Sequence, residues 1–181
     1  MSEEVFGGMM RGLKYGGLLL LTLAMIGCVS RYNEPEQGGS QAVATFRKGY
    51  DVHFPEGGMQ TYGISEHDDC TEAKMVAVFG PLIGGDAKTV RIIASHPAVI
   101  FAYSSISVGT AAPYPFTGMK TATCKRKFRF LAQEGHSYDI KQDSSIDGLC
   151  AMSVTDTTTG AAVASLPIAR TEACTRPDVW E

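Results

Sequence analysis

The chain of 181 residues lacks a hydrophobic run long enough to span a membrane. Its longest apolar stretch, from Gly16 to Ile26, has about 11 residues, whereas a transmembrane helix needs about 20. The chain also lacks a Cys-x-x-Cys pair, so zinc binding and thiol redox chemistry are poorly supported. The net charge is only −3 and no block of like charge occurs, which argues against nucleic-acid binding.

Sequence signatures of catalysis are absent as well. Serine, histidine and acidic residues are present, but no nucleophile elbow or comparable local pattern surrounds them. Gly84-Gly85 lacks the further glycines and the lysine of a phosphate-binding loop, and is expected to form a turn. We therefore predict a protein that is not an enzyme and holds no cofactor. The alternative is a hydrolase whose site forms only in three dimensions, with His67 or His96 beside a serine.

The first 28 residues have the layout of an export signal. Two positive charges, Arg11 and Lys14, precede the apolar run Leu18–Ile26, which ends in a small residue and then Cys28. The ending Met25-Ile26-Gly27-Cys28 resembles a bacterial lipobox, in which the cysteine sulfur receives a diacylglycerol before cleavage on its N-terminal side. The resemblance implies a mature chain that begins at Cys28 and is anchored in a membrane through lipid. An ordinary signal peptide with a coincidental cysteine and a cytosolic protein are the alternatives.

The residues before this signal fit it badly. Glu3 and Glu4 oppose the positive charge that an export signal carries at its start, whereas Met9 and Met10 stand immediately before Arg11. We therefore expect translation to begin at Met10 or Met9.

The residue after Cys28 is Val29 rather than aspartate. By resemblance to the sorting pattern of Gram-negative lipoproteins, this favours the outer membrane, with the domain facing the periplasm. The predicted organisation is a signal peptide over residues 1–27, the lipidated cysteine with a flexible tether over 28–41, a domain over 42–174 and a tail over 175–181.

Four further cysteines in an exported chain predict two disulfides: Cys70, Cys124, Cys150 and Cys174. Three pairings are possible. Over residues 124–130 the apolar side chains share the even positions with the first cysteine, while charges occupy all three odd positions. Over residues 150–154 the cysteine again shares its face with apolar residues, so both cysteines are expected to point inward. We therefore favour Cys124–Cys150, which leaves Cys70–Cys174 to hold the C-terminal tail.

Short apolar or alternating runs recur between turn signals, and no segment shows sustained helical spacing beyond a short helical turn at Ser65–Thr71. This pattern predicts an all-β fold, an antiparallel β-sandwich of about 7–9 short strands. A turn is expected at Pro55–Gly58. The predicted strands are Val43–Lys48, Tyr50–Phe54, Lys74–Phe79, Thr89–Ala94, Val99–Ser105, Thr121–Leu131, Ser137–Gln142, Leu149–Thr155 and Ala162–Leu166.

The last third of the chain forms a regular series of strands and turns. Gly135-His136-Ser137-Tyr138 is followed by Val154-Thr155-Asp156 and then Thr159-Gly160. This series resembles the "Gly-x-x-Tyr … Val-x-Asp-x-x-(Thr)-Gly" rhythm of transthyretin-like and other small extracellular β-sandwich domains. The resemblance covers about 35 residues and implies a fold rather than an activity.

The densest polar cluster is Glu66–Cys70, in which His67, Asp68 and Asp69 could ligate a divalent cation if the segment is a loop. His53 and His96 could complete such a site only through folding. A solvated loop that leads into a disulfide explains the same residues without a metal.

Two surfaces could bind a partner. Lys125, Lys127 and Arg129 share the outward face of one predicted strand, and could meet acidic groups or simply form a charged solvent face. Tyr114 and Phe116 lie in a proline-rich loop that could contact a partner or fold over one end of the sandwich. Trp180, in the tail, is either without fixed structure or a docking element.

These patterns together predict a lipid-anchored envelope protein of the bacterial outer membrane that binds or scaffolds an envelope protein partner. The alternative function is a periplasmic module that binds a metal or small solute through the Glu66–Cys70 loop. The sequence predicts contact with a membrane through the N-terminal lipid and no contact with nucleic acid.

Overall fold

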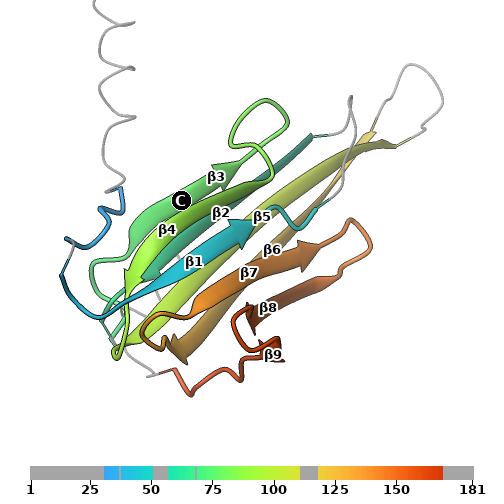
Figure 1. The fold of residues 1–181 in the computed structure, drawn as a ribbon. Coiled ribbons are helices and arrows are strands. Elements are labelled where there is room, and N and C mark those ends of the chain that lie inside the picture. The colour runs from blue at the N-terminus through green and yellow to red at the C-terminus, as the bar shows by residue number, and fades with distance from the viewer. Residues whose placement is uncertain (1–30, 37, 51–56, 68, 111–117, 169–181) are drawn as a thin grey trace, which may run out of the picture. The chain divides into compact units, whose positions relative to one another are not determined.

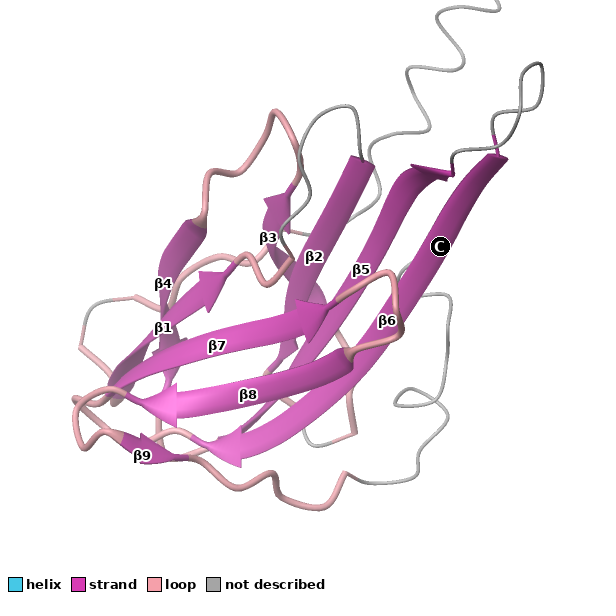
Figure 2. Cartoon of the chain, turned by 90° about the vertical axis from the view of Figure 1, so that its right-hand side faces the viewer, coloured by secondary structure: helices cyan, strands magenta, loops and turns pink. Residues whose placement is uncertain are grey.

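The computed structural model describes residues 31–36, 38–50, 57–67, 69–110 and 118–168, and shows two β-sheets packed face to face (Figures 1 and 2). One sheet has five strands in the order β4-β1-β7-β8-β9, and the other has four in the order β3-β2-β5-β6. The strands are β1 (Gln41–Arg47), β2 (Gly57–Ser65), β3 (Lys74–Phe79), β4 (Ala87–Ile93), β5 (Pro97–Thr110), β6 (Gly118–Leu131), β7 (Ser137–Ser144), β8 (Cys150–Asp156) and β9 (Ala161–Ala162).

The predicted all-β sandwich is confirmed, with one correction to strand direction. The four-stranded sheet is antiparallel throughout. The five-stranded sheet is mixed, because β1 pairs in parallel with β7, from Val43 opposite Ser137 to Arg47 opposite Lys141. Alternation of apolar and polar residues sets which face of a strand is buried, but it is the same for either strand direction.

The alternation in the sequence places the core as expected. In β1, Ala42, Ala44 and Phe46 are buried and the intervening residues are not. In β7, Tyr138 and Ile140 point into the same interior. Aromatic rings fill much of it, with the ring centroids of Phe46 and Tyr62 5.3 Å apart and those of Phe130 and Tyr138 5.0 Å apart.

The predicted pairing of Cys124 with Cys150 is confirmed, with the two Cα atoms 5.4 Å apart. Cys124 belongs to β6 and Cys150 to β8, so this disulfide joins the two sheets. Cys70 is buried and is also a disulfide cysteine. Its predicted partner, Cys174, lies outside the described residues, as do the tail at 175–181 and Trp180.

Strand β2 was not expected from the sequence. Its glycines, Gly57, Gly58 and Gly63, supply no side chain for packing, and the first two were assigned to a turn at Pro55–Gly58. β2 nevertheless lies between β3 and β5 and pairs with both. Backbone pairing on both sides therefore compensates for a sequence that is poor in strand-forming residues.

Three other predictions about elements are corrected or fall outside the structure. In the described residues of the Ser65–Thr71 segment there is no helix: Ser65 ends β2, and its hydroxyl donates to the Thr71 carbonyl at 2.6 Å to close a loop. The predicted Ala162–Leu166 strand is only Ala161–Ala162, because the chain then leaves β8 and runs to β6, where the Leu166 amide donates to the Arg129 carbonyl at 2.7 Å. In the predicted strand Tyr50–Phe54, Tyr50 is in a loop and the other residues lie outside the described part.

The segment predicted to be a flexible tether is, in its described part, built into the domain. The Tyr32 amide donates to the Met75 carbonyl at 2.8 Å, and the Arg91 guanidinium donates to the Glu34 carboxylate at 2.8 Å. The described part of the folded domain therefore extends back to Arg31, before residue 42, where the sequence placed its start. The polar composition of the segment suggested solvation, but Tyr32 provides a ring that packs against the core.

Candidate functional site

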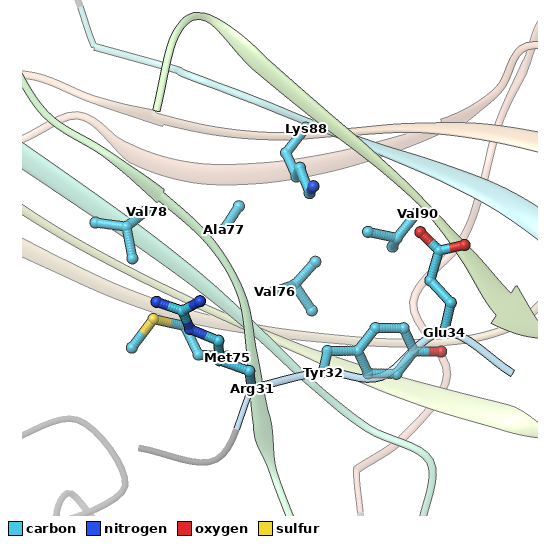
Figure 3. A pocket seen from close by; sticks show the side chains of 9 residues that line it. All are labelled: Arg31, Tyr32, Glu34, Met75, Val76, Ala77, Val78, Lys88 and Val90. Carbon is cyan, nitrogen blue, oxygen red and sulfur yellow. The ribbon is translucent and has the colours of Figure 1, made fainter. Parts of the chain in front are cut away.

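One side of the sandwich has open strand edges. β3 is the outer strand of the four-stranded sheet and β4 is the outer strand of the five-stranded sheet. They flank a cavity of about 320 Å³, which we call the edge groove (Figure 3). Its lining consists of Arg31, Tyr32, Glu34, Met75, Val76, Ala77, Val78, Lys88 and Val90.

The N-terminal segment closes one end of the edge groove. Arg31 forms a parallel β-bridge with Met75, so the segment runs beside the outer edge of β3. The Tyr32 hydroxyl lies 3.0 Å from Glu66 Oε1 and 3.1 Å from the Arg91 carbonyl, and donates toward these acceptors. Tyr32 thus connects the edge of one sheet to the edge of the other.

The surroundings of Tyr32 keep its hydroxyl protonated. Burial raises the pKa of Tyr32 far above its usual value, and the Glu66 carboxylate raises the pKa further through its charge and its hydrogen bond. A neutral phenol can donate to a carboxylate or a carbonyl, whereas a phenolate could not. The Tyr32 hydroxyl therefore remains a hydrogen-bond donor throughout the physiological pH range.

Of the charged side chains that line the edge groove, one is in a salt bridge and two are not. The hydrogen bond from Arg91 holds the pKa of the Glu34 carboxyl below its usual range, against the effect of burial, with the charges of Arg91 and Lys88 adding to the lowering. Arg31 and Lys88 form no salt bridge with a described residue. The groove therefore combines two cations with an apolar floor of valine, alanine and methionine side chains.

The loop that joins β3 to β4 exposes two large apolar side chains. Leu82 is 96% exposed and Ile83 is 57% exposed. The backbone of this loop is held by a hydrogen bond from the Gly80 amide to the Ile83 carbonyl at 2.9 Å. Gly84 has a φ of +86°, and a Cβ there would collide with the Val78 carbonyl, so only glycine fits. We call residues 80–86 the edge loop.

The residues predicted to bind metal do not converge in the described structure. His67 Nε2 lies 3.7 Å from a Glu72 carboxylate oxygen, and the Asp69 carboxylate accepts from the Thr71 amide and hydroxyl. His96 Nδ1 lies 3.5 Å from the Ala94 carbonyl. Among the described residues no group of three or more His, Cys, Asp or Glu side chains could hold a metal ion. His53 and Asp68 lie outside those residues.

The predicted basic face lies on β6, at the opposite edge of the four-stranded sheet from β3. The Lys125 ammonium stands 5.5 Å from the centre of the Tyr103 ring, and the Lys127 ammonium stands 5.5 Å from that of Phe101. Arg129 instead donates from Nη1 to the Pro167 carbonyl at 2.8 Å, which helps to hold the C-terminal segment.

Partner binding by this basic face stays a prediction. The other predicted partner-binding residues, Tyr114 and Phe116, lie outside the described residues, as does the predicted lipidation site Cys28.

Sequence reasoning missed the edge groove because its residues come from three separate segments: the N-terminal segment, β3 and β4. The one local signal was in the edge loop, where Leu82-Ile83 stands between Gly80-Pro81 and Gly84-Gly85. An apolar pair between turn residues is expected to lie on the surface rather than in the core. Exposed apolar side chains of this kind often mark a surface that binds something.

Comparison of the chain with models of known protein families, with curated proteins and with solved structures found no match. Within the residues that the structure describes, no helix has the length and apolar character needed to cross a bilayer. The function is therefore argued from the geometry of the edge groove and from the N-terminal sequence.

Proposed function

We propose that this protein is a lipid-anchored scaffolding or binding subunit of the bacterial envelope, attached to the outer membrane through Cys28 and facing the periplasm. The observation that carries the proposal is the position of Arg31, which already forms a β-bridge with β3 only three residues after Cys28. Lipid attachment at that cysteine would hold the domain directly at the membrane surface.

The short segment between Cys28 and Arg31 would keep the domain close to the membrane. Three peptide units reach about 11 Å at full extension, because each spans at most about 3.6 Å. The contacts of Tyr32 and Glu34 fix the point at which the chain enters the domain. A subunit attached in this way presents the same surfaces to its neighbours at all times, which suits a scaffold.

The partner would bind away from the anchored edge. The face of β6 that carries Lys125 and Lys127 is the best-supported surface, since it lies at the far edge of the sheet from β3. The Lys125 ammonium stands near the partly exposed Tyr103 ring and the Lys127 ammonium near the buried Phe101 ring, so an acidic partner would meet two positive charges beside one accessible aromatic ring. The resemblance of the last third to transthyretin-like domains belongs to this proposal as a statement about the fold alone.

Intact mass measurement of the protein from native membranes tests the anchor. We expect a mass that begins at Cys28 with added acyl chains, and we expect Cys28→Ala to remove the protein from the washed membrane fraction. Ser30→Ala is the matched control and is expected to remain in that fraction. An unlipidated chain in the wild type would overturn the proposal.

Crosslinking in membranes tests the scaffolding role. We expect one recurrent envelope protein to be captured with the wild type, and to be lost when Lys125→Glu and Lys127→Glu are combined. Lys120→Glu changes the charge on the same strand without facing either ring, and is expected to retain the partner. Repeated recovery of the protein alone would contradict the role.

A further inference from the structure

We propose that the β3–β4 edge is a membrane-docking surface, in which Arg31 and Lys88 meet the phosphates of anionic phospholipids while Leu82 and Ile83 enter the headgroup region. The inference rests on the proposed anchor at Cys28 and names what the domain does beside it. The edge groove, the edge loop and the entry point of the chain all belong to this one edge of the sandwich (Figure 1), and Figure 3 shows the groove lining from close by.

The first support is the direction in which Lys88 points. Lys88 is opposite Phe46 in the β1–β4 pairing and is two residues from the buried Val90, so it shares the inward-facing side of β4. Because β4 is an outer strand, this side of it lies at the uncovered edge between the two sheets. There Lys88 lines the edge groove together with Arg31. Two cations from separate segments thus gather at the edge nearest the anchor.

The second support is the balance of charge. Of the charged side chains that line the groove, Glu34 is paired with Arg91, whereas Arg31 and Lys88 form no salt bridge with a described residue. Glu66 accepts from the neutral Tyr32 hydroxyl and so keeps its negative charge, but it lies outside the groove lining. Asp86, at the end of the edge loop, is the remaining acidic side chain of the loop. Within the groove lining the two cations are therefore in excess, and each cation near an anionic membrane surface shifts the balance toward docking by about fivefold.

The third support is the edge loop. Leu82 is almost fully exposed, and the backbone of its loop is held by a hydrogen bond and by an obligatory glycine. The backbone of the loop therefore loses little conformational freedom when the leucine is buried. Apolar side chains beside cations are the combination that binds the interface of a bilayer. A lipid anchor within about 11 Å of Arg31 keeps the bilayer within reach of this edge.

Addition of a protein strand to β3 is disfavoured by the same structure. The register between β2 and β3 shifts at Tyr62/Gly63, which marks a bulge in the pairing of this outer strand. The Arg31–Met75 bridge also covers part of the outer edge of β3. A bulge and cover by another segment both hinder an outer strand from pairing with another chain.

The test uses the lipidated protein reconstituted in vesicles whose phospholipids carry brominated acyl chains, which quench tryptophan by contact. Trp180 is the only tryptophan, so Trp180→Phe provides a background in which one new tryptophan reports alone. Leu82→Trp places it in the edge loop. Leu149→Trp is the matched control, because Leu149 is 55% exposed and precedes β8 in the other sheet.

We expect quenching at position 82 and none at position 149 in vesicles that contain phosphatidylglycerol. Arg31→Gln combined with Lys88→Gln is expected to lower the docked fraction in those vesicles and to have little effect in uncharged phosphatidylcholine vesicles. Salt should weaken docking in the same way. Lys74→Gln, a cation on β3 outside the groove lining, is the control for charge alone.

Absence of quenching at position 82 in a sample whose mass shows the acyl chains would overturn the docking surface while leaving the anchor intact. Quenching at position 149 but not at 82 would overturn it as well, because another face would then meet the membrane. An unlipidated mass in that sample would instead reject the proposed anchor, so the two failures are distinguishable.

Discussion

The two ends of the space between the sheets are held together by different interactions. Toward one end, Ile100 of β5 lies opposite Ile64 on one side and Phe128 on the other, and all three are buried. Four residues farther along the same strand, Ser104 lies opposite Gln60. One end of the interior is therefore apolar, and the other is polar although it is equally buried.

The polar end is organised around two glutamines that are fully buried. Gln60 Nε2 donates to the Gln142 side-chain oxygen at 3.1 Å and to its carbonyl at 2.8 Å, which connects the two sheets. Gln142 Nε2 in turn donates to the carbonyl groups of Ala102 and Cys124. Among the described residues no buried side-chain nitrogen or oxygen lacks a hydrogen-bond partner.

The comparison teaches that burial alone does not say what a side chain contributes. At the apolar end the stabilisation comes from the volume that is filled, so loss of atoms leaves a cavity. At the polar end it comes from complete pairing, so loss of one partner leaves another group unsatisfied. The inter-sheet disulfide lies at the polar end, where Ser144 lies opposite Cys150.

The largest effect is expected at the apolar end. Phe130→Ala should lower the free energy of unfolding by about 3–5 kcal/mol, because it empties a fully buried site beside Phe128 and Tyr138. Denaturant unfolding followed by circular dichroism measures the change. Leu131→Ala, at an exposed neighbouring position, should cost no more than about 0.5 kcal/mol. Equal losses in the two variants would contradict the assignment of the core.

Removal of the inter-sheet disulfide should have the next largest effect. Cys124→Ala combined with Cys150→Ala opens a loop with a sequence separation of 26. The chain-entropy relation gives a loss of about 3.5 kcal/mol for a loop of this length. Thermal unfolding of the oxidised wild type and of the double variant measures it. An unchanged midpoint would show that the polar end is held by its hydrogen bonds alone.

The buried glutamines should show coupling. Gln142→Leu is expected to cost about 1–3 kcal/mol, since it leaves two carbonyl groups without their donor. Adding Gln60→Leu should cost less than its effect alone, because the two side chains share one network. A double-mutant cycle measures the coupling, with the exposed Gln133→Leu as control. Strict additivity would mean that the two side chains act independently.

The smallest expected effect is on the pH dependence of stability, and it involves Asp156, the last residue of β8. Burial acts to raise the pKa of Asp156, but hydrogen bonds from His136, Thr158 and Thr159 outweigh it and hold the pKa below its usual range. The stabilisation by Asp156 is therefore complete above the unfolded pKa of about 3.9 and is lost as the pH falls through the lower folded value.

Asp156→Asn should accordingly flatten the loss of stability in acid. Unfolding of the wild type and the variant at pH 7 and at pH 3 measures this, and the difference between the two proteins should shrink at the lower pH. A difference that is the same at both values would contradict the role of the carboxylate.

The sequence by itself determined which side of most strands is buried. In β6 the even positions carry Cys124, Phe128 and Phe130, and all three are buried as their alternation predicts. The same reasoning favoured pairing Cys124 with Cys150 because both were expected to point inward, and the structure places them on facing sheets, where they meet. A period of two residues is a local property, so it is visible without knowledge of the fold.

Only the tertiary structure decided which strands are neighbours and which segments meet. β1 pairs with β7 in parallel, β2 is a central strand despite its glycines, and Tyr32 packs on a domain from which it was expected to be separate. The edge groove depends on the last of these, because Tyr32 lines it together with residues of β3 and β4. Pairing depends on backbone hydrogen bonds and packing between residues far apart in the chain, and these act through the assembled sheets rather than through any local pattern.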